Sequence, residues 1–291
     1  MKKLFTLMAL VVVCTVAKAQ EDSTMTAKVD TIRVGNMVII KDKSKASTPD
    51  HTYGPNFHIG THNKKGNLSN ISTNWAVVDL GFSLYDDRTD YANTGGYIYN
   101  RDGVAPLGEG DFRLRTEKSI NVNIWFFIQR LNLIKHYVNL KYGLGLELNN
   151  YRFKTAVSFK ETNPFVTPPV SLPVVFRDSV HFSKNKLAAD YITVPFMLNF
   201  MSNPAYENKG LSLSVGVSAG YLYSERNKQV SEERGKRKNF GDFGMERFKF
   251  SYIGELGLGP VRLYGSYSPT SMFSDGLDMR PYTLGIRLSN W

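Results

Sequence analysis

Residues Ser119–Arg130 (SINVNIWFFIQR) alternate between apolar and polar side chains over most of their length. Successive side chains of a β-strand point to opposite faces, so this alternation predicts a strand with one apolar face and one amide-rich face. The predicted apolar face holds Ile120, Val122, Ile124, Phe126 and Ile128, and the opposite face holds Asn121, Asn123 and Gln129. A tilted strand of about eleven residues is long enough to cross a bilayer. We therefore predict a membrane-spanning strand.

Seven other segments repeat this pattern, and the connections between them alternate between long and short. The eight predicted strands are Trp75–Tyr85, Ser119–Arg130, Tyr137–Asn149, Asp190–Met201, Leu211–Tyr223, Phe248–Leu258, Val261–Ser268 and Arg280–Trp291. An even strand number with alternating loop lengths is typical of outer-membrane barrels. The predicted fold is all-β: an eight-stranded antiparallel transmembrane β-barrel with both termini in the periplasm. A soluble ligand-binding barrel is the alternative, but its outward faces should carry charge.

The first 73 residues are predicted to precede the barrel. Residues 1–19 combine Lys2-Lys3, an apolar run that contains the single Cys14, and Ala17-Lys18-Ala19, which together indicate a signal peptide. Residues 20–73 are polar and read as a periplasmic extension, in which only Thr31–Lys41 resembles a strand. The predicted barrel domain covers residues 74–291.

The chain is basic, with a formal net charge of +10 that becomes +7 (10 minus 3) if Lys2, Lys3 and Lys18 leave with the signal peptide. This charge suits a surface in contact with lipopolysaccharide phosphates, whereas an exported chain rarely meets nucleic acid. The candidate lipopolysaccharide-contacting loop is Glu225–Lys238. Its basic residues are Arg226, Lys228, Arg234, Lys236, Arg237 and Lys238. A plain solvated loop is the alternative.

Charged residues on the predicted inward faces form a second candidate site. They are Asp79, Lys141, Glu147, Glu255, Arg262 and Arg287, three acids against three bases. Eight strands enclose an interior that side chains fill, and an unpaired buried charge costs several kcal/mol. The sequence therefore predicts a plugged lumen with paired charges, with a proton or ion path and an open pore as alternatives.

No motif predicts catalysis, a metal or a cofactor. His51, His58 and His62 lie close together, but in a polar segment with glycine that offers no fixed frame for a metal. Asp178, Ser179 and His181 offer the residue types of a hydrolytic triad, but near neighbours in sequence seldom meet with that geometry. We expect no enzymatic activity.

The chain resembles the PorT-like outer-membrane β-barrel family of Bacteroidota over nearly the whole predicted mature sequence. The resemblance rests on Thr31–Lys41, Trp75–Phe82 (WAVVDLGF), Gly143–Phe153 (GLGLELNNYRF), Tyr191–Asn199 (YITVPFMLN) and Tyr282–Trp291 (YTLGIRLSNW). It implies insertion by the outer-membrane assembly machinery, which reads the last strand and its terminal aromatic residue. Trp291 stands at that position, although Asn290 is polar where an apolar residue is commoner.

The resemblance implies an outer-membrane location and, for some members, a link to protein secretion, but fold similarity does not itself establish a function. The function that we expect is a structural or accessory component of the envelope with a closed lumen. Its expected partners are outer-membrane lipid, lipopolysaccharide, the assembly machinery and an envelope protein bound through residues 20–73. A small-solute channel or transporter is the alternative.

Overall fold

The computed structural model describes residues 30–34, 37–41, 69–167, 172–205, 210–259 and 261–288. The chain divides into two units, residues 1–63 and 64–291. In the first unit, β1 (Asp30–Val34) pairs antiparallel with β2 (Met37–Lys41). The prediction of one continuous strand over Thr31–Lys41 is therefore wrong. Gly35-Asn36 lies between the two strands, and a Gly-Asn pair is a common hairpin signal.

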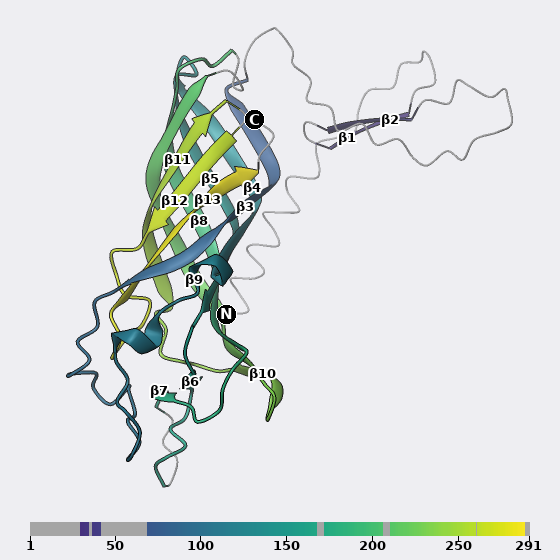
Figure 1. Ribbon diagram of the computed structural model, residues 1–291. Coiled ribbons are helices and arrows are strands. Elements are labelled where there is room, and N and C mark those ends of the chain that lie inside the picture. Colours follow the sequence, from purple (N-terminus) through teal and green to yellow (C-terminus); the bar gives the residue numbers. More distant parts are fainter. Residues whose placement is uncertain are drawn as a thin grey trace, which may run out of the picture. The chain divides into compact units, whose positions relative to one another are not determined.

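The second unit is an antiparallel barrel of eight strands (Figure 1). The strands are β3 (Ile71–Asp87), β4 (Ile120–Ile134), β5 (Val138–Arg152), β8 (Lys184–Met201), β9 (Leu211–Ser231), β11 (Phe248–Leu258), β12 (Val261–Tyr267) and β13 (Met279–Leu288). Each strand pairs with the next one in this order. Pairing of β13 with β3 closes the ring, so the sheet has no open edge within the barrel. All eight predicted strands are confirmed.

The strands continue beyond their predicted bounds at both ends of the barrel: β3 begins at Ile71 and β4 ends at Ile134 at the short-turn end, and the longest extensions lie at the cap end. β8 begins at Lys184, six residues before the predicted start, and β9 runs on to Ser231, where it pairs with β10 (Gly235–Phe240). The prediction of a loop over Glu225–Lys238 is therefore wrong, because this segment is mostly a β-hairpin. Its inward residues include Glu225, Asn227 and Gln229, so it lacks the apolar stripe from which the other strands were recognised.

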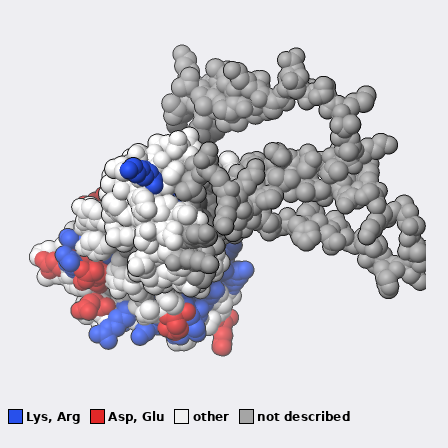
Figure 2. All heavy atoms as spheres, turned by 90° about the horizontal axis from the view of Figure 1, so that it is seen from above, with Lys and Arg blue, Asp and Glu red and all other residues white. Residues whose placement is uncertain are grey.

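The outward faces of the barrel form a continuous apolar belt. On β8 and β9, for example, Val194, Phe196, Val215 and Val217 are each about half exposed. Seen from above in Figure 2, the described surface is mostly free of charge, with one cation near its upper edge and Lys, Arg, Asp and Glu gathered along its lower and left margins. These apolar outward stripes are what lipid contact requires and are the reverse of a soluble barrel. Among the described residues, no helix is long and apolar enough to cross a membrane.

A β-bulge in β4 changes which residues face inward. The β4–β5 register shifts between Trp125 and Phe127, and opposite this bulge on β3, Ala76 adopts a positive φ of 54°. As a result Ile128, which was predicted to face lipid, is fully buried against Val77 and Trp125. Gln129, which was predicted to face inward, instead accepts a hydrogen bond from Tyr142 on the outward face. One extra residue moves the side chains that follow it to the other face, up to a second register shift between Asn132 and Ile134.

Pro195 lies in the middle of β8 and interrupts its pairing on one side. The β5–β8 register has partners at Tyr142–Phe196 and Gly145–Thr193, and none for the two residues between Phe196 and Thr193. Proline has no N–H to donate to a ladder, which accounts for this gap. On the other side, Pro195 stays in register with Ser218 of β9.

The long connections fold into a compact cap at one end of the barrel, below it in Figure 1. They contain two 3-10 helices, η1 (Glu109–Phe112) and η2 (Thr116–Lys118), and a small hairpin of β6 (Val157–Lys160) and β7 (Val174–Arg177). A hydrophobic core joins cap residues such as Phe159, Phe243 and Phe273 to barrel residues such as Tyr191 and Leu222. This core closes the loop end of the barrel, whereas the connections at the other end are short.

Candidate functional site

The six charged residues that were predicted to line the lumen are all buried inside the barrel. None of their side chains is more than about a tenth exposed, and they come from five different strands. Arg287 on β13 donates two hydrogen bonds to Asp79 on β3, with Nε–Oδ1 at 2.7 Å and Nη2–Oδ2 at 2.9 Å. Its third nitrogen, Nη1, lies 2.5 Å from Glu255 Oε2 on β11. One guanidinium therefore joins two carboxylates.

Glu255 is the centre of this group because it accepts from three cations. Lys141 Nζ lies 2.9 Å from both carboxylate oxygens, and Arg262 Nη1 lies 3.2 Å from Oε1. Asp79 is further bound by the indole N–H of Trp125 at 2.7 Å. Buried charges are stable only when paired and hydrogen-bonded in this way.

Lys249 on β11 is an interior charge that was missed in the sequence. It forms an ion pair with Glu147 and lies 4.9 Å above the ring of Tyr191. With Lys249 included, the group holds four bases and three acids, one positive charge more than the predicted balance. The residue occupies an inward position between the outward Phe248 and Phe250, so the alternation of that strand is the signal that could have identified it.

Amides and a tyrosine fill the interior between the charged groups. Asn121 Nδ2 donates to Asn149 Oδ1 at 2.9 Å, and the hydroxyl of Tyr264 reaches across the lumen to donate to Asn121. The ring of Tyr264 fits because Gly81 and Gly285 lie under it. A Cβ at Gly81 would lie 2.6 Å from the Tyr264 hydroxyl oxygen, and a Cβ at Gly285 would lie 2.6 Å from its Cε1. Both are too close for any side chain.

The candidate basic loop falls into two groups, because neighbouring residues of a strand face opposite ways. Arg226 and Lys228 on β9 and Lys236 and Lys238 on β10 share the outward face of the hairpin. Arg237 on β10 and Arg234 in the turn instead line a cavity in the cap. Arg226 forms an ion pair with Asp190 on β8.

Four cations lie directly opposite one another across four strands of this outward face. Arg152 on β5 pairs in register with Lys186 on β8, Lys186 with Lys228, and Lys228 with Lys238. We call these four residues the cation row. Burial and the neighbouring Lys184, Arg226 and Lys228 lower the pKa of Lys186 to about 8. Lys184, burial, Lys236 and Lys238 likewise lower the pKa of Lys228.

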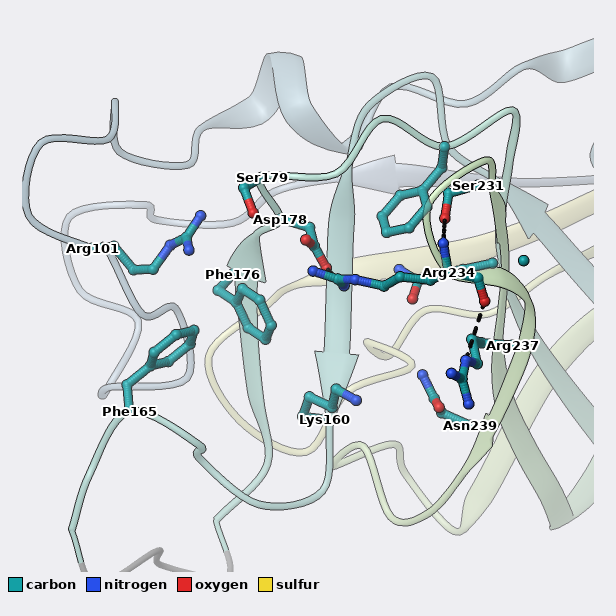
Figure 3. Close-up of a pocket in the computed structure, with 13 residues that line it drawn as sticks. Arg101, Lys160, Phe165, Phe176, Asp178, Ser179, Ser231, Arg234, Arg237 and Asn239 are labelled. Atoms are coloured by element: carbon teal, nitrogen blue, oxygen red, sulfur yellow. Dashed lines mark hydrogen bonds and ion pairs between the residues drawn. The ribbon is translucent and has the colours of Figure 1, made fainter.

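The cavity in the cap has a volume of about 400 Å³ (Figure 3). Four cations, Arg101, Lys160, Arg234 and Arg237, line it together with one carboxylate, Asp178. Phe165, Phe176 and Phe182 supply apolar walls, and Gln229, Ser231 and Asn239 supply polar groups. We call this the cap pocket. In the figure, Arg101 lies on the opposite side from Arg237 and Asn239, and Arg234 extends between them toward Asp178.

Asp178, Ser179 and His181 do not form a hydrolytic triad. The carboxylate of Asp178 accepts from Ser158 Oγ at 2.9 Å and from Arg234 Nη1 at 2.9 Å, and neither contact involves His181. His51, His58, His62 and Trp291 lie outside the described residues. Within the described ranges, no group of three or more His, Cys, Asp or Glu side chains is placed to hold a metal ion.

Comparison with known proteins identifies the family of the barrel. The model of the family described as "Outer membrane protein beta-barrel domain" matches residues 75–269, more than half of the 291 residues. Among solved structures, the chain is similar to Ail, the attachment invasion locus protein of Yersinia pestis, at 11% identity and a TM-score of 0.27, over 74% of this chain and 99% of that one. No curated protein matches the chain. On the family match, the chain belongs to the outer membrane protein beta-barrel domain family.

Proposed function

We propose that this protein is a closed structural or accessory barrel of the outer membrane, which holds its folded cap at the outer surface and conducts no solute. Barrels of this kind place long loops outside the cell and short turns in the periplasm, so the cap would face outward. The single observation that carries the proposal is the filled interior, in which Glu255 binds Lys141, Arg262 and Arg287 at once.

The filling argues against the channel alternative on two counts. First, the cations and carboxylates of the lumen satisfy one another, and a passing ion would have to break bonds that cost several kcal/mol to lose. Second, the apolar core around Phe159 and Phe273 lies over the loop end, where the two rings stack 6.0 Å apart. A water-filled path would need both layers to open.

Single-channel recording in planar bilayers tests this proposal. The wild-type protein is expected to give no discrete current steps at 1 M salt, in bilayers where a general porin conducts. A loosened variant, Tyr264→Ala and Lys141→Ala in the lumen with Phe159→Ala in the cap core, checks the sensitivity of the assay, because it removes side chains from both layers at once. Reproducible steps from the folded wild-type barrel would favour the small-solute channel instead.

We also propose that residues 20–73 bind a periplasmic or envelope protein, in line with an accessory role that includes protein secretion. The short β1–β2 hairpin is a minimal recognition element, because a two-stranded hairpin is marginal on its own and gains stability from a partner. Crosslinking in native outer membranes, with and without residues 20–73, tests this. A stoichiometric partner that is lost with the deletion supports the proposal, and an unchanged crosslink pattern contradicts it.

Lipopolysaccharide is the partner that we propose for the cation row. Like charges directly opposite each other on neighbouring strands destabilise a sheet. The cation row nevertheless places four positive charges side by side. They lie toward the cap from Tyr221 and Tyr223, the lipid-facing tyrosines of β9. Phosphates of the outer leaflet would lie at this level and would neutralise the row through charge-assisted hydrogen bonds.

Replacement of Lys228 by Gln tests this partner through opposite effects in two environments. In a zwitterionic detergent, the variant is expected to unfold at a higher temperature than wild type, because it relieves repulsion between like charges on neighbouring strands. In lipopolysaccharide-containing bilayers, it is expected to unfold at a lower temperature, because a phosphate contact is lost. Lys118→Gln, at an exposed lysine of η2 outside the row, is the control. The same sign in both environments would contradict the proposal.

A further inference from the structure

The cap pocket carries more positive charge than its own acid can neutralise. Arg101, Lys160, Arg234 and Arg237 bring four positive charges, and Asp178 brings one negative charge, which leaves an excess of three (4 minus 1). Burial alone would raise the pKa of Asp178, but the N–H of Val180, the guanidinium of Arg234 and the hydroxyl of Ser158 outweigh it and lower that pKa. Asp178 is therefore ionised and already engaged.

Three of the four cations keep donor groups available. The side chain of Lys160 has no ion pair or hydrogen bond with any described residue, and Arg237 makes one contact, from Nε to the carbonyl of Arg234 at 3.2 Å. Arg101 donates through Nη2 to the carbonyl of Arg177 at 2.8 Å, while its Nε is buried without a partner. A buried donor without a partner costs free energy, and a bound anion removes that cost.

Beside these donors the pocket has an ordered aromatic wall. Phe165 meets Phe176 edge to face with ring centroids 4.8 Å apart, and Arg101 lies 5.8 Å above the Phe165 ring. A fixed apolar wall next to a few polar groups is the usual composition of a small-molecule site, and about 400 Å³ lies near the lower limit for such sites. The space is enough for one or two sugar rings.

We propose that the cap pocket binds a sugar that carries a phosphoryl group. A phosphate monoester has a charge of about −1.5 to −2 at pH 7 and three acceptor oxygens, which matches an excess of three positive charges better than a carboxylate or a sulfate ester does. The guanidinium groups of Arg237 and Arg101 suit the forked geometry of phosphate. The ring of the sugar would lie against Phe165 and Phe176. This proposal is independent of the closed barrel and of the cation row.

Calorimetric titration of the full chain in phosphatidylcholine nanodiscs with glucose 6-phosphate tests the pocket. Wild type is expected to bind glucose 6-phosphate at least about tenfold more tightly than glucose or glucose 6-sulfate. Lys160→Gln should weaken binding about tenfold without loss of any internal contact, and Arg237→Gln should do the same. Lys238→Gln is the matched control, because it removes the neighbouring charge from the opposite face of β10.

Three results would overturn the proposal: no binding by wild type, no preference for the phosphorylated sugar, or equal weakening by Lys238→Gln. A second set of nanodiscs, made with lipopolysaccharide whose core carries phosphate, distinguishes two sources of the ligand. Loss of glucose 6-phosphate binding there, and its recovery when the core phosphates are removed, identifies the lipid core as the occupant. Unchanged binding identifies a free sugar phosphate.

Discussion

Arg287 and Asp79 lie directly opposite each other across the seam where the last strand of the barrel meets the first. Their side chains turn into the lumen and form a bidentate pair, with N–O distances of 2.7 and 2.9 Å. Because β13 can pair with β3 only after the whole chain has been laid out, this contact forms across 208 residues of sequence. The ion pair fixes the register of β13 against β3 when the barrel closes, because a shift of one residue would separate the two charges.

Asp79→Asn is expected to destabilise the barrel strongly. It leaves Arg287 buried with one carboxylate instead of two, and an uncompensated buried charge costs about 3–5 kcal/mol. Unfolding by urea in detergent micelles measures the loss. Asp86→Asn, which breaks the exposed pair of Asp86 with Arg88, is the control and should cost less than about 1 kcal/mol. Equal effects of the two substitutions would show that burial of the seam pair is irrelevant.

Ala76→Gly is expected to stabilise the barrel, although glycine usually weakens a strand. Ala76 has a φ of 54°, a left-handed conformation that costs a residue with a Cβ about 1–2 kcal/mol and costs glycine almost nothing. Part of this gain is offset by the greater freedom of glycine in the unfolded chain, so we expect a net increase of up to about 1 kcal/mol. The same urea titration measures it.

The control for this substitution is Ala219→Gly, at another lipid-facing position of the barrel, on β9. Ala219 is not among the residues with positive φ, so glycine there should lower the free energy of unfolding by about 0.5–1 kcal/mol. Two changes of the same sign would contradict the assignment of strain to Ala76.

The strands could be predicted from the sequence because lipid contact imposes an unbroken two-residue period. The predicted ends of β11 match the observed ends. The outward residues of β8 and β9, such as Val194 and Val217, were also identified correctly. The bulge at Phe126 could not be predicted, because a single inserted residue leaves no signal in an already apolar run. Ile128 and Gln129 were consequently assigned to the wrong faces.

The candidate sites divide in the same way. The interior charges were visible because a charge within an apolar alternation must face inward, and Lys249 was overlooked although it obeys that rule. The cap pocket could not be predicted. Its cations come from positions 101, 160, 234 and 237, which lie in three different connections, and only tertiary packing of these segments brings them together.

Phe159→Ala is expected to loosen the cap without unfolding the barrel. Phe159 is fully buried among Phe153, Phe243 and Phe273, and truncation of a buried Phe costs about 3–5 kcal/mol. The amides of β6 and β7 should exchange hydrogen faster than in wild type, while the amides of Leu213–Ala219 on β9 should keep their protection. Phe240→Ala, at a side chain that is 64% exposed, is the control. Equal quickening in both regions would mean that cap and barrel unfold as one unit.

Glu225 makes the stability of the cap depend on pH near neutrality. It lies on β9 beyond the lipid-facing residues, and burial, Asp242 and Glu161 raise its pKa from 4.5 to about 7, against the opposing effects of the Phe243 N–H and Arg247. Its Oε2 accepts the N–H of Phe243 at 3.1 Å, while Oε1 is buried without a partner. The folded state therefore favours the protonated carboxyl group.

The sign of the pH dependence follows from this pKa. Between pH 4.5 and about 7 the folded cap binds a proton that the unfolded chain releases, so the stabilisation is complete below pH 4.5 and is lost as the pH rises through 7. The difference in pKa sets an upper bound of roughly 3 kcal/mol on this loss.

Hydrogen exchange of the cap amides from pH 4 to 8, corrected for intrinsic rates, measures this effect. In wild type, the free energy of cap opening should decline as the pH rises, and Glu225→Gln should remove that decline. Glu117→Gln, at an exposed carboxyl group, should leave this pH dependence in place. If Glu225→Gln retained the full decline, another group would have to be its source.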